Sequence, residues 1–242
     1  MNRFIKTLVA LSLSLILGAA QATLVFDAVS TTGGGTTSFT HTPVGTPGCV
    51  VVLVAGADAA ITSGTYGGNA MTEAAASPAD TGTGEIPTAG IDGTSAWILG
   101  SSVPTGAQTV AFTGTGLTSV IAAAYTLTSD EDCEELDSGV VESATQANPE
   151  VTLTFGGREG FAAIGFTSGQ DAVANITPRT DWTGDQEVDP GTLTLGNYSY
   201  DTIGTADVTA GFDQGADDVQ MVAVAVAEIV TGTAVSKIIQ QH

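Results

Sequence analysis

Basic residues are the scarcest class in this chain. Its 242 residues include 5 lysines and arginines against 26 aspartates and glutamates, which gives a formal net charge of −21 at pH 7. A surface of that sign repels nucleic-acid phosphates and anionic lipid headgroups, so we expect neither a nucleic-acid partner nor a membrane-surface partner. The same surface can collect divalent cations.

Histidine is nearly as rare. The sequence holds His41 and the terminal His242, together with Cys49 and Cys133. A Ser-His-Asp triad would have to use His41, and no Gly-x-Ser-x-Gly motif accompanies it, so we interpret His41 as a partly exposed strand residue. Zinc needs several Cys or His ligands at short spacing, which this sequence does not offer. The sequence therefore predicts a protein that is not an enzyme and requires no cofactor.

Two readings are open for the cysteines. In an oxidising compartment Cys49 and Cys133 can pair, which would close a loop of roughly 85 residues and contribute about 4 kcal/mol. Alternatively they remain separate thiols, because Cys49 opens an apolar strand and Cys133 lies in an acidic loop. Spacing alone does not decide between the two.

The N-terminus has the layout of a bacterial secretory signal peptide. Arg3 and Lys6 precede an apolar run over residues 8–17, and Ala20 and Ala22 form a small-x-small ending. Cleavage is expected after Ala22, which predicts an exported protein. The alternative is an uncleaved hydrophobic helix. The run is too short to span a bilayer as an ordinary transmembrane helix.

Aromatic residues are few, at 6%, whereas glycine is abundant, with 31 residues. Threonine and valine fit a pleated strand, and glycine suits tight turns. Period-two patterns predict about a dozen strands: residues 24–29, 36–41, 49–55, 62–66, 70–74, 95–99, 109–113, 117–128, 151–155, 161–166, 192–195, 206–212 and 221–229. Residues 156–160 are expected to join two of these strands as a hairpin. Loops are expected at 77–93, 129–137 and 181–191.

These patterns predict an all-β fold. We expect an antiparallel two-sheet sandwich of jelly-roll or immunoglobulin-like type, preceded by the hydrophobic leader helix. No linker and no repeat of fixed period is evident in the sequence. We therefore expect a leader or helix at 1–22, one domain at 23–230 and a tail at 231–242.

The acidic loop is a candidate calcium site. Six carboxylates fall within eight residues, and alternate members can converge on a hard cation that prefers oxygen ligands. The alternative is a solvated charged loop, because the spacing fails the EF-hand pattern at Glu135 and Val141. The candidate ligands are Asp130, Asp132, Glu134 and Asp137, with Glu131 and Glu135 beside them.

A second acidic segment contains a tryptophan. Trp182 lies between Asp181 and Asp185 in a polar stretch, and it is the better candidate for contact with a sugar or a protein partner. Trp97 lies in an apolar strand and is expected in the core. Paired carboxylates can also hydrolyse a glycosidic bond, although a sequence cannot place two of them in one cleft. As cation ligands, a weaker acidic set is Asp181, Asp185, Glu187 and Asp189, and the pair Asp217 and Asp218 is weaker still.

One stretch resembles a known family. Residues 61–72, ITSGTYGGNAMT, are similar to a Tyr-Gly-Gly hairpin in a Gly/Thr-rich β-sandwich domain of phage virion proteins and secreted bacterial surface proteins. The segments FDAVSTTGGGTTSFTHT, VVVLVAG and SAWILG follow the order of that family. The resemblance implies a structural or adhesive module without catalysis, although virion members lack the leader.

Three functions remain open. The first is a non-catalytic exported protein that builds or decorates an extracellular filament or particle surface, with its own copies as partners through strand edges. The second is a virion decoration or tail component. The third is a carbohydrate-binding module or glycosidase that uses Trp182 and the loop acids.

Overall fold

A computed structural model describes residues 24–32, 35–57, 60–76, 93–117, 119–170, 172–188 and 194–229, and this part of the chain folds mainly as β-sheet. Within these ranges there are strands and one short 3-10 turn, η1 (Val173–Asn175). The prediction of an all-β fold with antiparallel pairing is confirmed. The predicted leader helix, the tail at 231–242, nearly all of the loop at 77–93 and Asp189 lie outside the described residues.

The N-terminal half of the chain forms two sheets. A five-stranded inner sheet has the order β1-β9-β3-β7-β6, and a four-stranded outer sheet has the order β2-β8-β4-β5. Gly67 and Gly68, both with positive φ, make the predicted turn between β4 and β5. The strands are β1 (Val25–Thr31), β2 (Ser38–His41), β3 (Pro47–Ala57), β4 (Ala60–Tyr66), β5 (Asn69–Ala70), β6 (Thr72–Ala76), β7 (Gly93–Leu99), β8 (Gln108–Thr115) and β9 (Ser119–Thr128).

The C-terminal half forms two further sheets. Its five-stranded inner sheet has the order β10-β17-β12-β15-β14, and its three-stranded outer sheet has the order β11-β16-β13. The strands are β10 (Cys133–Gln146), β11 (Glu150–Leu153), β12 (Gly160–Ser168), β13 (Thr177–Pro178), β14 (Trp182–Val188), β15 (Thr194–Tyr200), β16 (Val208–Asp213) and β17 (Asp217–Glu228). The described residues thus form four sheets where the sequence predicted two.

The two halves repeat one topology. When β1 is matched with β10 and β9 with β17, the inner sheets have the same strand order, and the outer sheets match likewise apart from the short β5. The pairing registers also correspond: Val52 of β3 pairs with Trp97 of β7, and Ile164 of β12 pairs with Tyr198 of β15 at the matching positions. Bulges recur at matching places, in β1 and β10 and again in β6 and β14. The chain therefore contains an internal structural repeat.

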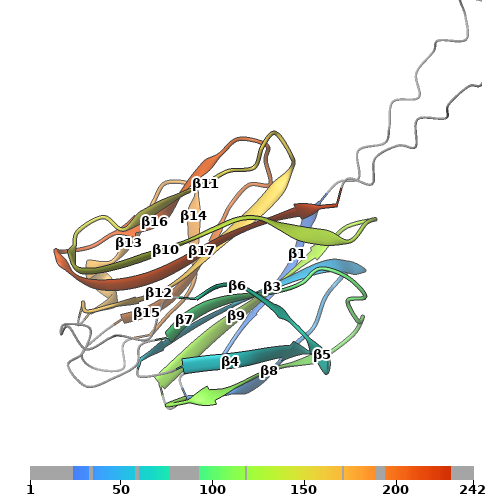
Figure 1. The fold of residues 1–242 in the computed structure, drawn as a ribbon, viewed down its shortest axis with the longest axis horizontal. Coiled ribbons are helices and arrows are strands. Elements are labelled where there is room, and N and C mark those ends of the chain that lie inside the picture. The colour runs from blue at the N-terminus through green and yellow to red at the C-terminus, as the bar shows by residue number, and fades with distance from the viewer. Residues whose placement is uncertain are drawn as a thin grey trace, which may run out of the picture.

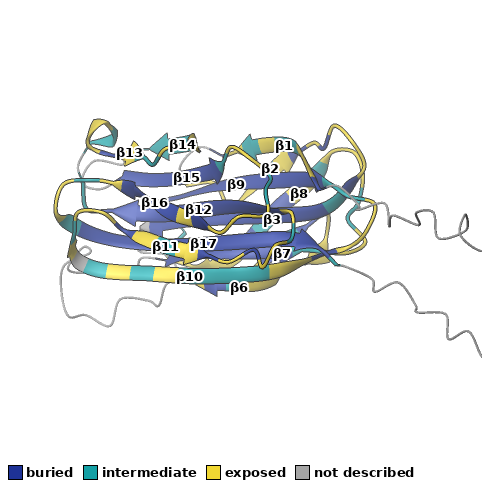
Figure 2. Ribbon diagram, turned by 90° about the horizontal axis from the view of Figure 1, so that it is seen from above, coloured by how far each residue is buried: buried dark blue, intermediate teal, exposed yellow. Residues whose placement is uncertain are grey.

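The four sheets stack in layers with the two inner sheets in the middle (Figure 1). Between the inner sheets lies a middle core that includes Leu53, Tyr125, Phe161 and Val224. An N-terminal core lies between the inner and outer sheets of the first half, and a C-terminal core lies between those of the second half. The inner strands are therefore buried on both faces, as the burial colouring shows (Figure 2).

Strand β3 shows why the inner strands read as continuous apolar runs. Its odd residues Val51 and Leu53 enter the middle core, while its even residues Val50 and Val52 enter the N-terminal core. Successive side chains of a strand point to opposite faces, so a strand covered on both sides needs apolar residues at every position.

The halves pack about an approximate two-fold axis. Strand β3 lies against β12, β9 against β15 and β7 against β17, while β1 faces β14 and β6 faces β10. When each strand is replaced by its match in the other half, the contact of β9 with β15 becomes that of β17 with β7, and the contact of β1 with β14 becomes that of β10 with β6. This exchange is what a two-fold axis produces. Figure 2 shows β1 and β14 along one side of the molecule and β6 and β10 along the other.

Three sequence predictions about loops and hairpins were wrong. Residues 133–137 belong to β10, and residues 182–188 form β14, and both segments are edge strands of their sheet. Strands β11 and β12 do not form a hairpin, since β11 pairs with β16 whereas β12 pairs with β15 and β17. Gly156 and Gly157 make the turn, but a turn does not fix the sheet that the chain enters next.

Candidate functional site

The junction between the halves is held by a disulfide. Cys49 of β3 and Cys133 of β10 are bonded, with 5.7 Å between their Cα atoms and a sequence separation of 84. Cys133 begins a strand, so its placement in a loop was wrong. The backbone N–H of Cys133 also donates to the carbonyl of Gly100 at 2.7 Å. Residue 100 must be glycine here, because a Cβ on it would clash with the Cys133 carbonyl oxygen. This hydrogen bond ties the first half to the start of the second.

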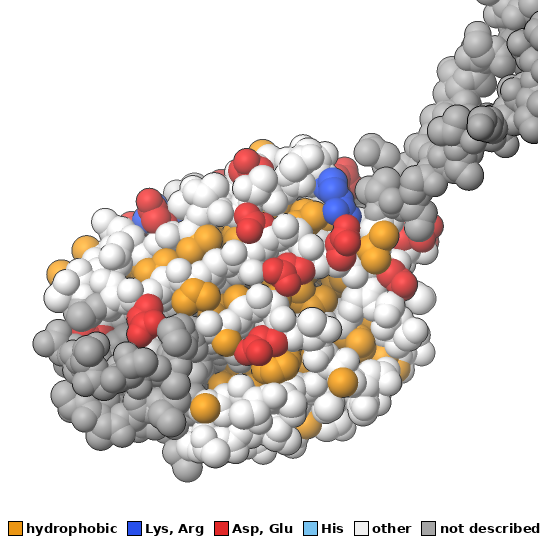
Figure 3. Space-filling model, viewed as in Figure 1, with side chains coloured by type: hydrophobic (Ala, Val, Ile, Leu, Met, Phe, Trp, Pro, Cys, Tyr) orange, Lys and Arg blue, Asp and Glu red, His pale blue; other side chains and the backbone are white. Residues whose placement is uncertain are grey.

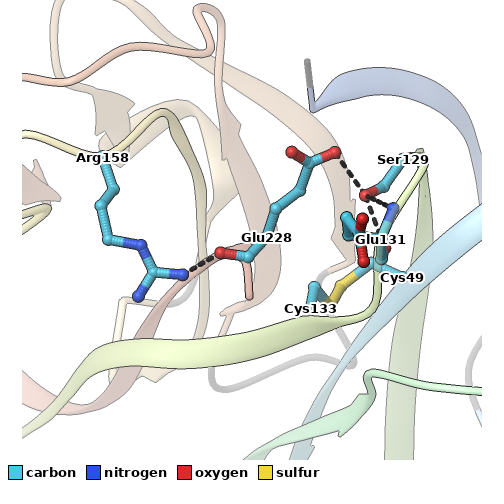
Figure 4. Close-up of a disulfide and its surroundings, with 6 residues drawn as sticks. All are labelled: Cys49, Ser129, Glu131, Cys133, Arg158 and Glu228. Carbon is cyan, nitrogen blue, oxygen red and sulfur yellow. Dashed lines mark hydrogen bonds between the residues drawn. A yellow bond between two sulfur atoms is a disulfide. The ribbon is translucent and has the colours of Figure 1, made fainter. Parts of the chain in front are cut away.

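A polar network surrounds the disulfide (Figure 4). The Ser129 hydroxyl donates to the carboxylate of Glu228 and can donate to the carbonyl of Glu131, 2.6 Å away. Arg158 donates to the backbone carbonyl of Glu228 and forms an ion pair with Glu134 at 2.7 Å. One of the two arginines among the described residues is therefore committed to fixing the end of β17 against β10.

The predicted calcium ligands are spread over this junction. Asp130 and Asp132 are exposed in the connection, while Glu134 pairs with Arg158. Asp137 accepts a hydrogen bond from the backbone N–H of Thr154 at 2.8 Å. No group of three or more His, Cys, Asp or Glu side chains is arranged to hold a metal ion in the part of the chain that the structure describes. The calcium site stays a prediction.

The segment around Trp182 borders a pocket of about 530 Å³ at one end of the C-terminal half. Trp182 itself is only 6% exposed, and its ring lies 5.4 Å from that of Tyr200. The expected loop placement was wrong, since Trp182 begins β14 and contributes to the core, and its role in binding stays a prediction. The charged part of the pocket wall comes from Arg179, Asp181, Asp207 and Asp213.

Asp185 lies apart from this pocket. It is the bulged residue of β14 and accepts a hydrogen bond from the Tyr125 hydroxyl of the other inner sheet at 2.8 Å. Burial raises the pKa of the Asp185 carboxyl and raises that of Tyr125 well above its ordinary value. The structure therefore does not bring Asp185 together with Trp182 and Asp181, and Asp185 instead joins the two halves.

A buried polar cluster lies inside the N-terminal half. His41 was interpreted as partly exposed, yet it is fully buried between β1, β4 and β9. Its Nε2 lies 3.1 Å from the Thr126 hydroxyl, which donates to Asp27 at 2.9 Å. Burial lowers the pKa of His41, and it raises that of Tyr66 to about 12. His41 Nδ1 and the Tyr66 hydroxyl oxygen are buried and have no hydrogen-bond partner among the residues that the structure describes.

The repeat shows that this polar cluster is not needed by the topology. His41 and Leu153 are the last residues of the matched strands β2 and β11, and Asp27 and Leu136 occupy the matched bulges. The second half thus uses leucine where the first uses titratable groups. Sequence reasoning missed the cluster, because residues from four strands, β1, β2, β4 and β9, converge only in the fold.

Strand β1 carries an apolar surface at the edge of its sheet. Val25, Phe26 and Val29 are 49%, 42% and 38% exposed, and β1 pairs on one side only, with β9. The view in Figure 3 shows carboxylates spread over another face and very few basic groups. The sequence indicated strand edges as contact surfaces without indicating which one.

Comparison of the chain with protein-family models, with curated proteins and with solved structures found no match. Among the described residues, no helix has the length and apolar character needed to cross a membrane.

Proposed function

We propose that this chain is a non-catalytic, exported structural protein that assembles into, or decorates, an extracellular filament or particle surface. The observation that carries the proposal is the exposed apolar strand β1 at an open sheet edge. Unpaired strand edges are templates for pairing, and natural proteins usually protect them with charge, lysine above all. The two lysines of this sequence, Lys6 and Lys237, both lie outside the strands described.

The disulfide supports the export part of the proposal. Structural disulfides persist in oxidising compartments and are rare in reducing ones. A buried bond between Cys49 and Cys133 fits a protein that folds after export, as the signal-like N-terminus predicts. We expect mass spectrometry of the native protein to give a chain that begins at Thr23, with one disulfide. A native chain that begins at Met1 would contradict export by cleavage.

Each half is consistent with a jelly roll. Its first strand pairs with its last in the inner sheet, and the chain passes between the two sheets of the half. Jelly rolls occur in viral capsid proteins and in lectins, and this likeness alone assigns no function. Together with the Tyr-Gly-Gly resemblance it keeps a virion decoration or tail component as the alternative form of the assembly proposal.

A second candidate function is carbohydrate binding, favoured by the pocket beside Trp182. Aromatic, carboxylate and guanidinium groups line it, and these are the groups that contact sugar rings and hydroxyls. A glycan array tests this candidate. Binding lost on Asp181→Ala would favour it over a purely structural role.

Static light scattering across ionic strength tests the assembly proposal. Net charge opposes association at low salt, so the average mass should rise as salt screens the repulsion. The same measurement on a chain that ends at residue 230 asks whether the last segment adds as a strand to a neighbouring copy. A monomer at every ionic strength would overturn the proposal.

A further inference from the structure

The two halves differ in chemistry where their first strands, β1 and β10, reach solvent. Matched through their bulges, Val25 and Phe26 of β1 correspond to Glu134 and Glu135 of β10. All four of these side chains are exposed. One fold position therefore carries apolar residues in one half and carboxylates in the other, so the apolar residues of β1 are not required by the topology.

The other three edges of the inner sheets carry acids. Glu73 is exposed on β6, Glu187 is half-buried on β14, and β10 has the two glutamates just named. The single acid of β1 is Asp27, whose carboxylate is held by the backbone N–H groups of Val44 and Gly45 at 3.0 and 2.7 Å. Charged edges resist pairing, which leaves β1 as the inner-sheet edge open to it.

Resting on the proposed assembly, we infer that β1 pairs antiparallel with β1 of a second copy of this chain. The two inner sheets would then join across a two-fold axis into one continuous sheet. Charge selects this occupant, because each copy is strongly acidic and β1 against β6, β10 or β14 would bring the carboxylate of Glu73, Glu135 or Glu187 to the contact. A contact of β1 with itself brings only Asp27, whose carboxylate is already held by two backbone N–H groups, and a two-fold contact is self-complementary.

The available length of β1 is set by its neighbours. Gln186 of β14 donates to the carbonyl of Thr32, so the edge that remains for a partner runs over β1 itself. Phe26 packs on Phe161 with ring centroids 6.0 Å apart, which fixes its ring at the rim of the middle core. A second copy would cover the exposed parts of Val25, Phe26 and Val29 together.

The repeat supplies the test variant. Val25→Glu/Phe26→Glu/Val29→Ser places on β1 the residues that β10 carries at its matched positions. Val140→Glu/Thr152→Glu is the charge-matched control, since both side chains are exposed and lie on β10 and β11, in the other half of the chain. Sedimentation equilibrium at high salt should show a dimer or larger species for wild type and control, and at least tenfold weaker association for the β1 variant.

Each outcome decides a different question. If the wild type associates and the β1 variant associates equally well, the β1 contact is wrong while the assembly proposal stands. If the control loses association as strongly, net charge alone governs it and the β1 contact is also wrong. A wild type that stays monomeric overturns both. Should the triple variant not fold, as judged by circular dichroism, Val29→Glu alone replaces it, with Val140→Glu as its control.

Discussion

Removing the Cys49–Cys133 bond is expected to lower the free energy of unfolding by about 4.5 kcal/mol, because the bond spans 84 residues of sequence and restricts the unfolded chain accordingly. For a chain of this size, 1 kcal/mol corresponds to about 2–4 °C in melting temperature. The reduced protein should therefore melt about 9–18 °C lower. It should still fold, because the middle core holds the halves together without the bond.

Both cysteines are buried, at 0% and 4% exposure, so reductant must be added to the unfolded protein before refolding. Urea unfolding followed by tryptophan fluorescence then gives the two free energies, and mass spectrometry of alkylated samples verifies the redox state. Cys49→Ala/Cys133→Ala serves as the control and should not respond to reductant. A verified reduction that changes the free energy of unfolding by less than about 1 kcal/mol would refute the loop-entropy argument.

Three further predictions concern single side chains. His41→Leu, which installs the residue found at Leu153, should remove part of the acid sensitivity. Burial lowers the pKa of His41 below its ordinary 6.5, so the unfolded state takes up the proton first and stability falls as pH drops below about 6.5, by up to about 1.4 kcal/mol per pKa unit; equal losses between pH 7.5 and 5 for variant and wild type would contradict this. Trp182→Ala should cost about 3–5 kcal/mol in urea unfolding because the ring is buried, whereas a loss below 1 kcal/mol would indicate an exposed contact residue. If calcium binds the junction, millimolar Ca²⁺ should raise the melting temperature and Asp130→Asn/Asp132→Asn should abolish the rise; an unchanged wild-type melting curve would leave a solvated acidic segment.

Much of the strand content was predictable from the sequence. The doubly apolar run in β3 and the Gly67–Gly68 turn were read directly from residue pattern, and Trp97 was expected in the core, where it is 4% exposed. Strands β10 and β14 were missed because their acids lie on sheet edges, where charge is tolerated and breaks the apolar alternation.

The repeat could not be recognised from the sequence, because the shared topology fixes which positions are buried and does not fix which residue types occupy them. Matched places hold Trp97 and Tyr198, or His41 and Leu153, which share position and burial but little chemistry. The sites depended on long-range geometry in the same way. Cys49 and Cys133 approach only because β3 and β10 lie in facing sheets, and Asp185 is directed to Tyr125 by a bulge.

The middle core has a consequence for the order in which the chain folds. The N-terminal half comes first in the chain, and its inner sheet presents Val51, Leu53 and Tyr125 on a face that only the C-terminal half covers. That face remains exposed until β12 and β17 form. Cys133 follows only a few residues after β9, so Cys49 can form its disulfide before the sheets of the second half have formed. The interval between these two events is the period in which the chain is most exposed to mispairing with its neighbours.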